Sequence, residues 1–184
     1  MSSTLLALWL PIIIIGYIIM KYNTLVQLKT AIGWAFADID VQMKMRFDLI
    51  DNLVNTVKGY ATHEKDTLES LTKARTSFLS AQSMDEKVAA DNQISGALKT
   101  IFSVAEAYPD LKANTNFLQL QTDLSDIENK VAASRRYFNS SVGSYNAAIQ
   151  TFPGNIIAQV FKFTPSEFFA VTNEAEKVVP KVQF

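Results

Sequence analysis

The single histidine, His63, is the first residue to weigh for chemistry, because the chain contains no cysteine. His63 and Glu64 begin like a zinc-protease HExxH motif, but Lys-Asp-Thr follows, so the second histidine is absent. A zinc site would then depend almost entirely on carboxylates, whereas zinc prefers nitrogen and sulfur ligands. A Ser-His-Asp triad would also need His63, and no G-x-S-x-G turn is present. We therefore predict no catalytic residue and no metal site, with His63 on the surface of a helix or partly packed.

The acidic residues suggest a second kind of chemistry, a di-metal site inside a helical bundle. The acidic residues to consider are Asp38, Asp48, Glu64, Glu106 and Glu128. Di-metal bundles take ligands from Glu-x-x-His pairs that face inward, and no such pair occurs here. We expect these carboxylates to lie on solvated helix faces or in ion pairs between helices. Glycine-rich phosphate loops are also absent, so no cofactor is predicted.

Arginines placed among apolar residues are the remaining candidates. Arg46 interrupts an apolar column, and Arg135 and Arg136 follow one another. A charge on a packing face usually has a partner, so an Arg–carboxylate pair inside the bundle is the favoured interpretation. The alternative is a ligand-binding arginine in a polar site between helices. The residues that would form this polar cluster are Asp38, Arg46, Glu106, Arg135, Arg136 and Asn146.

Composition narrows the class of protein. The chain has 184 residues, with 17 basic and 18 acidic side chains and a net charge of −1. Nothing here resembles the basic footprint of a nucleic-acid binder, so no nucleic acid is expected as a partner. The absence of cysteine excludes a disulfide framework. Glycine (6) and proline (5) are scarce, which favours long helices.

Residues 1–20 carry no charged side chain. The apolar part, Leu5 to Met20, would span roughly 24 Å as a helix, and flanking residues extend it toward the ~30 Å hydrocarbon core. A cleaved signal peptide would need a basic start and a small-residue cleavage site, which are missing. A buried core helix is the other alternative. We predict an uncleaved single-pass anchor that meets the lipid bilayer through residues 4–22.

The charges around this segment predict its orientation. Lys21, Lys29, Lys44 and Arg46 follow the apolar segment, and no basic residue precedes it. The positive-inside rule then places the C-terminal domain in the cytoplasm, with a very short N-terminus outside.

Heptad spacing after the anchor predicts packed helices. One column holds Leu25, Ile32, Ile39, Leu53 and Tyr60, with Arg46 in series, and a second holds Phe36, Met43, Ile50 and Val57. Both columns lie on one face of a helix. Because no proline occurs between Pro11 and Pro109, we expect one rod from Leu5 to Ala81. Trp34, Phe36 and Phe47 are expected to fill the core.

Three further elements follow. A helix is predicted from Met84, with Ser83 or Asp85 as N-cap, ending before Pro109. A long helix should run from about Asn114 to Gln150, and a short one over 156–161. The tail, 163–184, is expected to be irregular or partly helical. The predicted fold is all-α: a transmembrane helix followed by an antiparallel bundle of about four helices, with long first and third helices.

Several stretches resemble one known family. The stretches are IDVQMKMRFDLIDNLVNTVKGYATHEKDTLESLTKAR (39–75), AEAYPDLKANTNFLQLQTDL (105–124), ENKVAASRRYFNSSVGSYNAAIQTFPGNIIAQVFKF (128–163) and the final PKVQF. They are similar to the ordered sequence blocks of the LemA family. The resemblance covers about residues 20–184, nearly the whole chain.

The resemblance implies a bacterial cytoplasmic-membrane protein with one N-terminal transmembrane helix and an antiparallel helical bundle. Family members include proteins of magnetosome membranes, which implies roles at membranes, and the resemblance supplies no catalytic residue or cofactor. Where the family usually reads D-L-I-P-N-L, this chain has Asp51 in place of proline. A kink expected there should be weaker or absent.

These observations predict a non-enzymatic, membrane-anchored helical scaffold or adaptor that self-associates as a homo-oligomer and contacts protein partners that the sequence does not identify. The expected domains are an anchor over 1–22 and a LemA-like bundle with an apolar tail over 23–184. The alternative is a membrane-tethered ligand-binding or sensor bundle with a polar site between helices.

Overall fold

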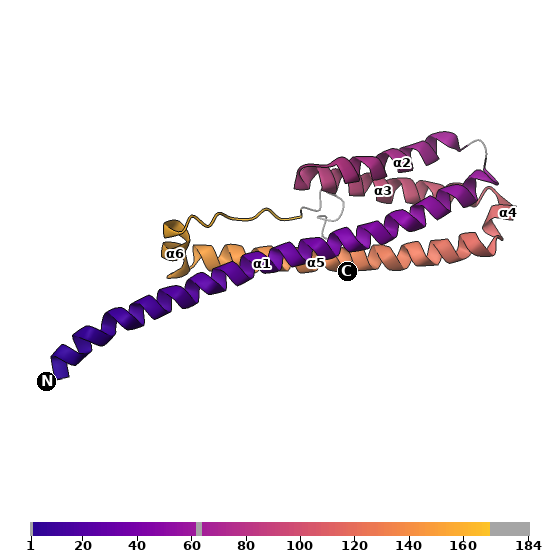
Figure 1. Cartoon of the computed structure of the whole chain (residues 1–184). Coiled ribbons are helices and arrows are strands. Elements are labelled where there is room, and N and C mark those ends of the chain that lie inside the picture. Colours follow the sequence, from indigo (N-terminus) through magenta and orange to yellow (C-terminus); the bar gives the residue numbers. More distant parts are fainter. Residues whose placement is uncertain (1, 62–63, 170–184) are drawn as a thin grey trace, which may run out of the picture. The chain divides into compact units, whose positions relative to one another are not determined.

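The computed structural model of the chain describes residues 2–61 and 64–169, with side chains from residue 9 onward. His63 and the tail from residue 170 therefore lie outside the described residues. The described part contains helices and no strand, as the sequence predicts (Figure 1). The helices are α1 (Ser2–Lys58), α2 (Lys65–Ser80), α3 (Met84–Ala105), α4 (Pro109–Lys112), α5 (Thr115–Gln150) and α6 (Gly154–Val160).

Helix α1 joins the apolar segment to the bundle without a break over 57 residues. It continues through Asp51, the position where the family usually has proline, as expected from the retained backbone N–H. The prediction of a rod to Ala81 is wrong, because α1 ends at Lys58 and α2 begins at Lys65. Gly59 follows directly, and glycine disfavours helix by about 1 kcal/mol relative to alanine. The amide of Ala61 still bonds the carbonyl of Val57, which closes the last turn.

The chain forms two compact units, to which α1 and α5 both contribute. Unit 1 comprises the described residues up to Ile39 together with Ala133–Phe168. Unit 2 comprises Asp40–Ala132 and Phe169.

Unit 2 is a bundle of four longer helical segments, namely the end of α1, α2, α3 and the start of α5, with the one-turn helix α4 between α3 and α5. Helices α2 and α3 pack against each other. Edge-to-face aromatic pairs join α1 to α2 (Phe47–Phe78, 5.5 Å between ring centroids) and α3 to α5 (Phe102–Phe117, 6.1 Å). Its core is apolar and includes Met43, Ile50, Leu53, Leu71, Ile94, Leu98, Leu124 and Val131.

The start of α3 is a capping box, and it confirms Ser83 as the N-cap. The Ser83 hydroxyl accepts the amide hydrogen of Glu86, and the Glu86 carboxylate accepts the amide hydrogen of Ser83. Two amides at the start of the helix are thereby satisfied without help from other elements.

Unit 1 packs α6 and the end of α5 against the first half of α1. Its core cluster is Leu25, Tyr145, Ile149, Ile157 and Ala158, bordered by Tyr22, Leu28, Ile32, Ala148 and Phe163. Figure 1 shows α6 folded back beside the end of α5. This small helix is therefore held by tertiary packing, because seven residues are too few for a stable isolated helix.

Most residues of the predicted columns are buried, but two aromatic predictions are wrong. Trp34 is 73% exposed and Tyr60 is 42% exposed. Trp34 lies two residues after Ile32, which turns it about 200° around the helix and away from the packed face. Tyr60 follows the end of α1, so the heptad position no longer places its side chain. Phe47 is buried as predicted.

Candidate functional site

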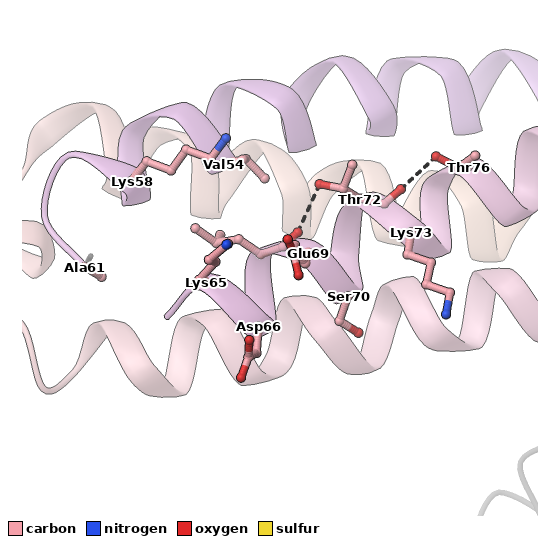
Figure 2. Close-up of a pocket in the computed structure, with 11 residues that line it drawn as sticks. Val54, Lys58, Ala61, Lys65, Asp66, Glu69, Ser70, Thr72, Lys73 and Thr76 are labelled. Atoms are coloured by element: carbon pink, nitrogen blue, oxygen red, sulfur yellow. Dashed lines mark hydrogen bonds between the residues drawn. The ribbon is translucent and has the colours of Figure 1, made fainter. Parts of the chain in front are cut away.

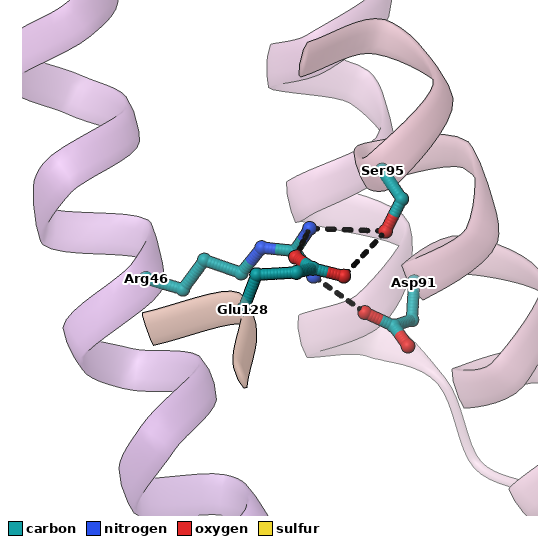
Figure 3. Close-up of polar contacts among 4 residues, drawn as sticks. All are labelled: Arg46, Asp91, Ser95 and Glu128. Carbon is teal, nitrogen blue, oxygen red and sulfur yellow. Dashed lines mark hydrogen bonds and ion pairs between the residues drawn. The ribbon is translucent and has the colours of Figure 1, made fainter. Parts of the chain in front are cut away.

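Arg46 is the most deeply buried charged residue described in unit 2, with 0% of its surface exposed. Figure 3 shows its guanidinium reaching from α1 toward α3 and α5. Its Nη1 donates to Asp91 Oδ1 at 2.8 Å, and its Nη2 donates to Ser95 Oγ at 3.0 Å. Nη2 also forms an ion pair with Glu128 Oε2. The sequence-based interpretation of Arg46 as part of an Arg–carboxylate pair within the bundle is confirmed.

The cluster around Arg46 is a closed network rather than a set of separate pairs. Ser95 accepts a hydrogen bond from Arg46 and donates its own hydroxyl to Glu128 Oε1 at 3.3 Å. Asp91 is 1% exposed, whereas Glu128 is 42% exposed. The Arg46 guanidinium thus forms ion pairs with two carboxylates, one buried and one partly exposed to water.

Burial sets the electrostatics of this cluster. Loss of water lowers the pKa of Arg46, and the nearby Glu128 carboxylate opposes that shift. A guanidinium keeps its proton even so, because its ordinary pKa lies far above physiological pH. The buried Asp91 carboxylate therefore faces a permanent positive charge. The network joins α1, α3 and α5 and is structural: both terminal nitrogens of Arg46 are engaged inside the core, while its buried Nε has no hydrogen-bond partner among the described residues.

Asp91 and Ser95 are the two members that the sequence reasoning missed. Asp91 lies on the buried stripe of α3, and the half-buried Ser95 borders it, between Val88 and Leu98. The sequence signal that could have found them is a polar residue at an apolar position of the second helix, the same signal that singled out Arg46 in the first. The sequence does not show, however, that these residues contact Arg46.

The other residues of the predicted polar cluster have their own surroundings. In unit 1, Asp38 accepts a hydrogen bond from the Ser134 hydroxyl. Arg135 is half-buried and Arg136 is exposed on α5. In unit 2, Glu106 is exposed at the end of α3. None of the partners described for Arg46 is another member of the predicted cluster.

Asn146 fixes the segment that follows α6. Its amide nitrogen donates to the carbonyl of Ser166, and its amide oxygen accepts the Ser166 N–H, both at 2.9 Å. The neighbouring Tyr145 hydroxyl donates to the carbonyl of Thr164 at 3.0 Å. Burial raises the pKa of Tyr145, so its hydroxyl remains a donor at all physiological pH values. These bonds tie the extended segment to α5 within unit 1.

A groove in unit 2 runs along α2 beside the end of α1, with a volume of about 1010 Å³ (Figure 2). Lysines and carboxylates both line it, among them Lys58, Lys65, Asp66 and Glu69. The hydroxyl of Thr72, also in the groove, donates to a backbone carbonyl of its own helix. Such a mixed lining does not select one ligand charge. Among residues 9–61 and 64–169, no group of three or more His, Cys, Asp or Glu is arranged to hold a metal ion.

The other exceptional surface lies on α1 itself. Every side chain from Trp9 to Met20 is exposed, including four consecutive isoleucines at 50–65%. In the part of the chain that the structure describes, α1 is the one helix long and apolar enough to cross a membrane. Only 6% of its apolar window is buried, unlike the core helix of a soluble domain.

The chain thus combines an exposed apolar helix with a bundle whose buried charges pair with one another. This combination defines the class of membrane-associated helical-bundle proteins. The family model for the LemA family matches residues 35–184, and the chain belongs to this family. The sequence resemblance to that family is confirmed.

Curated relatives agree with this assignment. Protein LemA of Metamycoplasma hominis is 32% identical over 144 residues, which are 76% of this chain and 64% of that protein. Magnetosome protein MamQ of Magnetospirillum gryphiswaldense is 23% identical over 83% of this chain and 65% of its own length. Magnetosome protein MamQ 1 of Paramagnetospirillum magneticum is 23% identical over 84% of this chain and 66% of its own length. The chain thus spans just under two-thirds of these relatives, whose names state no catalytic activity.

Proposed function

We propose that this protein is a non-enzymatic, membrane-anchored helical scaffold or adaptor that self-associates at the bacterial cytoplasmic membrane. Residues 4–22 form the anchor, and the bundle lies on the cytoplasmic side. The observation that carries the proposal is the exposed apolar run Trp9–Met20 at the start of a helix that continues into the bundle.

The energetics of this run support a lipid environment. Burying one large aliphatic or aromatic side chain is worth about 1.5–3 kcal/mol, and the run exposes ten apolar side chains at 37–65%. From Ser2 to Met20 the helix is about 28 Å long, close to the ~30 Å hydrocarbon core. Lys21 follows immediately, where a basic side chain can reach the headgroups.

The interior of the bundle supports a structural role over catalysis. Arg46, the arginine with the strongest claim to bind a ligand, is engaged by Asp91, Ser95 and Glu128. Arg46 is also fully buried, so a ligand from solvent has no access to its guanidinium. The long bundle instead offers its outer surface to partner proteins and to other copies of the chain. Anchoring in one membrane raises the effective concentration of copies, which favours association.

The proposed orientation rests on charge. Lys21 and Lys29 follow the apolar run within ten residues, and the positive-inside rule counts basic residues that close to a span. The relatives named as magnetosome proteins are consistent with a membrane role.

Two measurements test the proposal. Because the chain has no cysteine, Ser3→Cys and Ser140→Cys report the two sides of the membrane in intact cells treated with an impermeant maleimide. We expect labelling at position 3 only; labelling at position 140 only would reverse the orientation, and labelling of both in a soluble fraction would refute the anchor. Mass photometry in mild detergent should show oligomers, and monomers alone at micromolar concentration would contradict self-association.

A further inference from the structure

A second apolar surface lies in unit 1, next to the end of the exposed apolar run of α1. Tyr22, two residues after Met20, packs its ring against Phe161 (4.7 Å between centroids) and Phe163 (5.7 Å). Two residues correspond to about 3 Å along the helix axis. The end of α6 therefore lies level with the point where the proposed span leaves the hydrocarbon.

The side of α6 that faces away from the core, and the residues at either end of it, carry large apolar side chains beside the polar Asn155 and Gln159. Gly154, Ile157 and Ala158 are buried against α1 and α5. The large apolar side chains face outward: Phe152 is 80%, Ile156 53%, Val160 68% and Phe161 48% exposed. Large apolar side chains exposed beside polar Asn155 and Gln159 are what a surface needs to lie at the boundary between hydrocarbon and headgroups.

The charge around this surface has one sign. The described segments 17–37 and 140–163 contain Lys21, Lys29 and Lys162 and no aspartate or glutamate, although the whole chain has a net charge of −1. Lys21 lies over the ring of Tyr17 at 5.8 Å, and Lys29 lies over that of Phe163 at 6.0 Å. Lysines that flank exposed apolar side chains are the composition of interfacial helices on anionic lipid.

We propose that the α6 platform (Phe152, Ile156, Val160, Phe161 and Lys162) rests in the headgroup region of the same bilayer that α1 enters. The occupant of this surface is an anionic phospholipid interface. Two observations favour it: the surface is continuous with the proposed span, and its neighbouring charged residues are lysines. Unit 1 then touches the membrane at two places, which fixes its tilt and rotation. This inference rests on the proposed function, because it requires α1 to be in the membrane.

The experiment uses the full chain with single cysteines carrying the fluorophore NBD, reconstituted in phosphatidylethanolamine–phosphatidylglycerol vesicles. Val160→Cys reports the α6 platform, and Ile13→Cys reports the span. Trp34→Cys is the matched control, because Trp34 is 73% exposed in the same unit but twelve residues, about 18 Å, beyond Tyr22 along α1. Nitroxide lipids should quench position 160 when the nitroxide is near the headgroup, and position 13 when it is deep. Position 34 should respond only to aqueous iodide.

Each other outcome has a distinct meaning. Quenching at position 13 without lipid quenching at position 160 would overturn the α6 platform and leave the anchor intact. No lipid quenching at either position would overturn the proposed function as well. Blue-shifted emission at position 160 without lipid quenching would place a second copy of the chain, rather than lipid, on this surface and overturn the proposal.

Lipid charge provides an independent test of the same surface. Replacing phosphatidylglycerol by phosphatidylcholine, or Lys162 by glutamine, should lower lipid quenching at position 160 by about twofold, as expected when anionic lipids attract the lysines. Lys112→Gln, an exposed lysine of α4 in unit 2, is the control and should have no effect. Quenching at position 160 that is independent of both changes would overturn the assignment of anionic lipid as the occupant.

Discussion

Replacing Arg46 by methionine is the sharpest perturbation of the bundle. The substitution keeps a long apolar stem but removes the guanidinium that donates to Asp91 at 2.8 Å and to Ser95 at 3.0 Å. Asp91 is only 1% exposed, so its carboxylate would lose the Arg46 guanidinium while it remains buried. Removing one partner of a buried ion pair typically costs 3–5 kcal/mol, and we expect Arg46→Met to fall in that range.

The structure separates the contributions of the two carboxylates. Glu128 is 42% exposed, and exposed ion pairs are worth at most about 1 kcal/mol, so Glu128→Gln should cost about 1 kcal/mol or less. The double variant Arg46→Met with Asp91→Leu removes both buried charges. Replacing a buried pair by apolar residues is often close to neutral, so the double variant should recover most of the loss.

These free energies can be measured by unfolding the full chain with guanidinium chloride in mild detergent, with far-UV circular dichroism as the readout of helix content. For a chain of this size, 3–5 kcal/mol corresponds to a fall of about 6–20 °C in Tm. A cost below about 1 kcal/mol for Arg46→Met would refute the reasoning, because it would mean that the Arg46 guanidinium contributes little to stabilising the buried Asp91 carboxylate. A double variant no more stable than Arg46→Met alone would show that the cost comes from packing instead.

Three further predictions follow from other contacts. Ser83→Ala removes the N-cap of α3 and should cost about 1 kcal/mol of unfolding free energy in the same assay; no loss would show that the cap is not needed. Backbone amides lower the pKa of Glu86 in the folded state, so its stabilising effect should be present above its ordinary pKa of 4.5 and be lost as pH falls below it. The stability difference between wild type and Glu86→Ala should therefore shrink on acidification, and a difference independent of pH would contradict this. Gly154→Ala places a Cβ 2.1 Å from the carbonyl oxygen of Ala148 and should lower Tm, whereas Gly96→Ala, in open space inside α3, should raise stability by about 0.5–1 kcal/mol; similar effects at both positions would refute the steric argument.

The sequence by itself determined the elements and their inward faces. Apolar residues at seven-residue spacing marked the buried side of α1, because a helix places such residues on one face whatever its partner is. The uncharged run before Lys21 marked the one helix apolar enough for a membrane, since composition alone sets that property. The N-cap of α3 was narrowed to Ser83 or Asp85 from the sequence, because capping involves residues only a few positions apart, and the structure shows Ser83.

Partners across helices were decided only by the tertiary structure. Arg46 stood out in the sequence, but Asp91 and Ser95 lie 45 and 49 residues further along the chain, and periodicity does not say which helix turns a polar residue toward it. The end of α1 at Lys58 was likewise missed, because the apolar pattern continues through the turn. The contact of Phe161 with Tyr22 also depends on how α6 folds back on α1. Local spacing specifies which face of a helix is buried, while the match between faces of distant segments depends on their packing together in three dimensions.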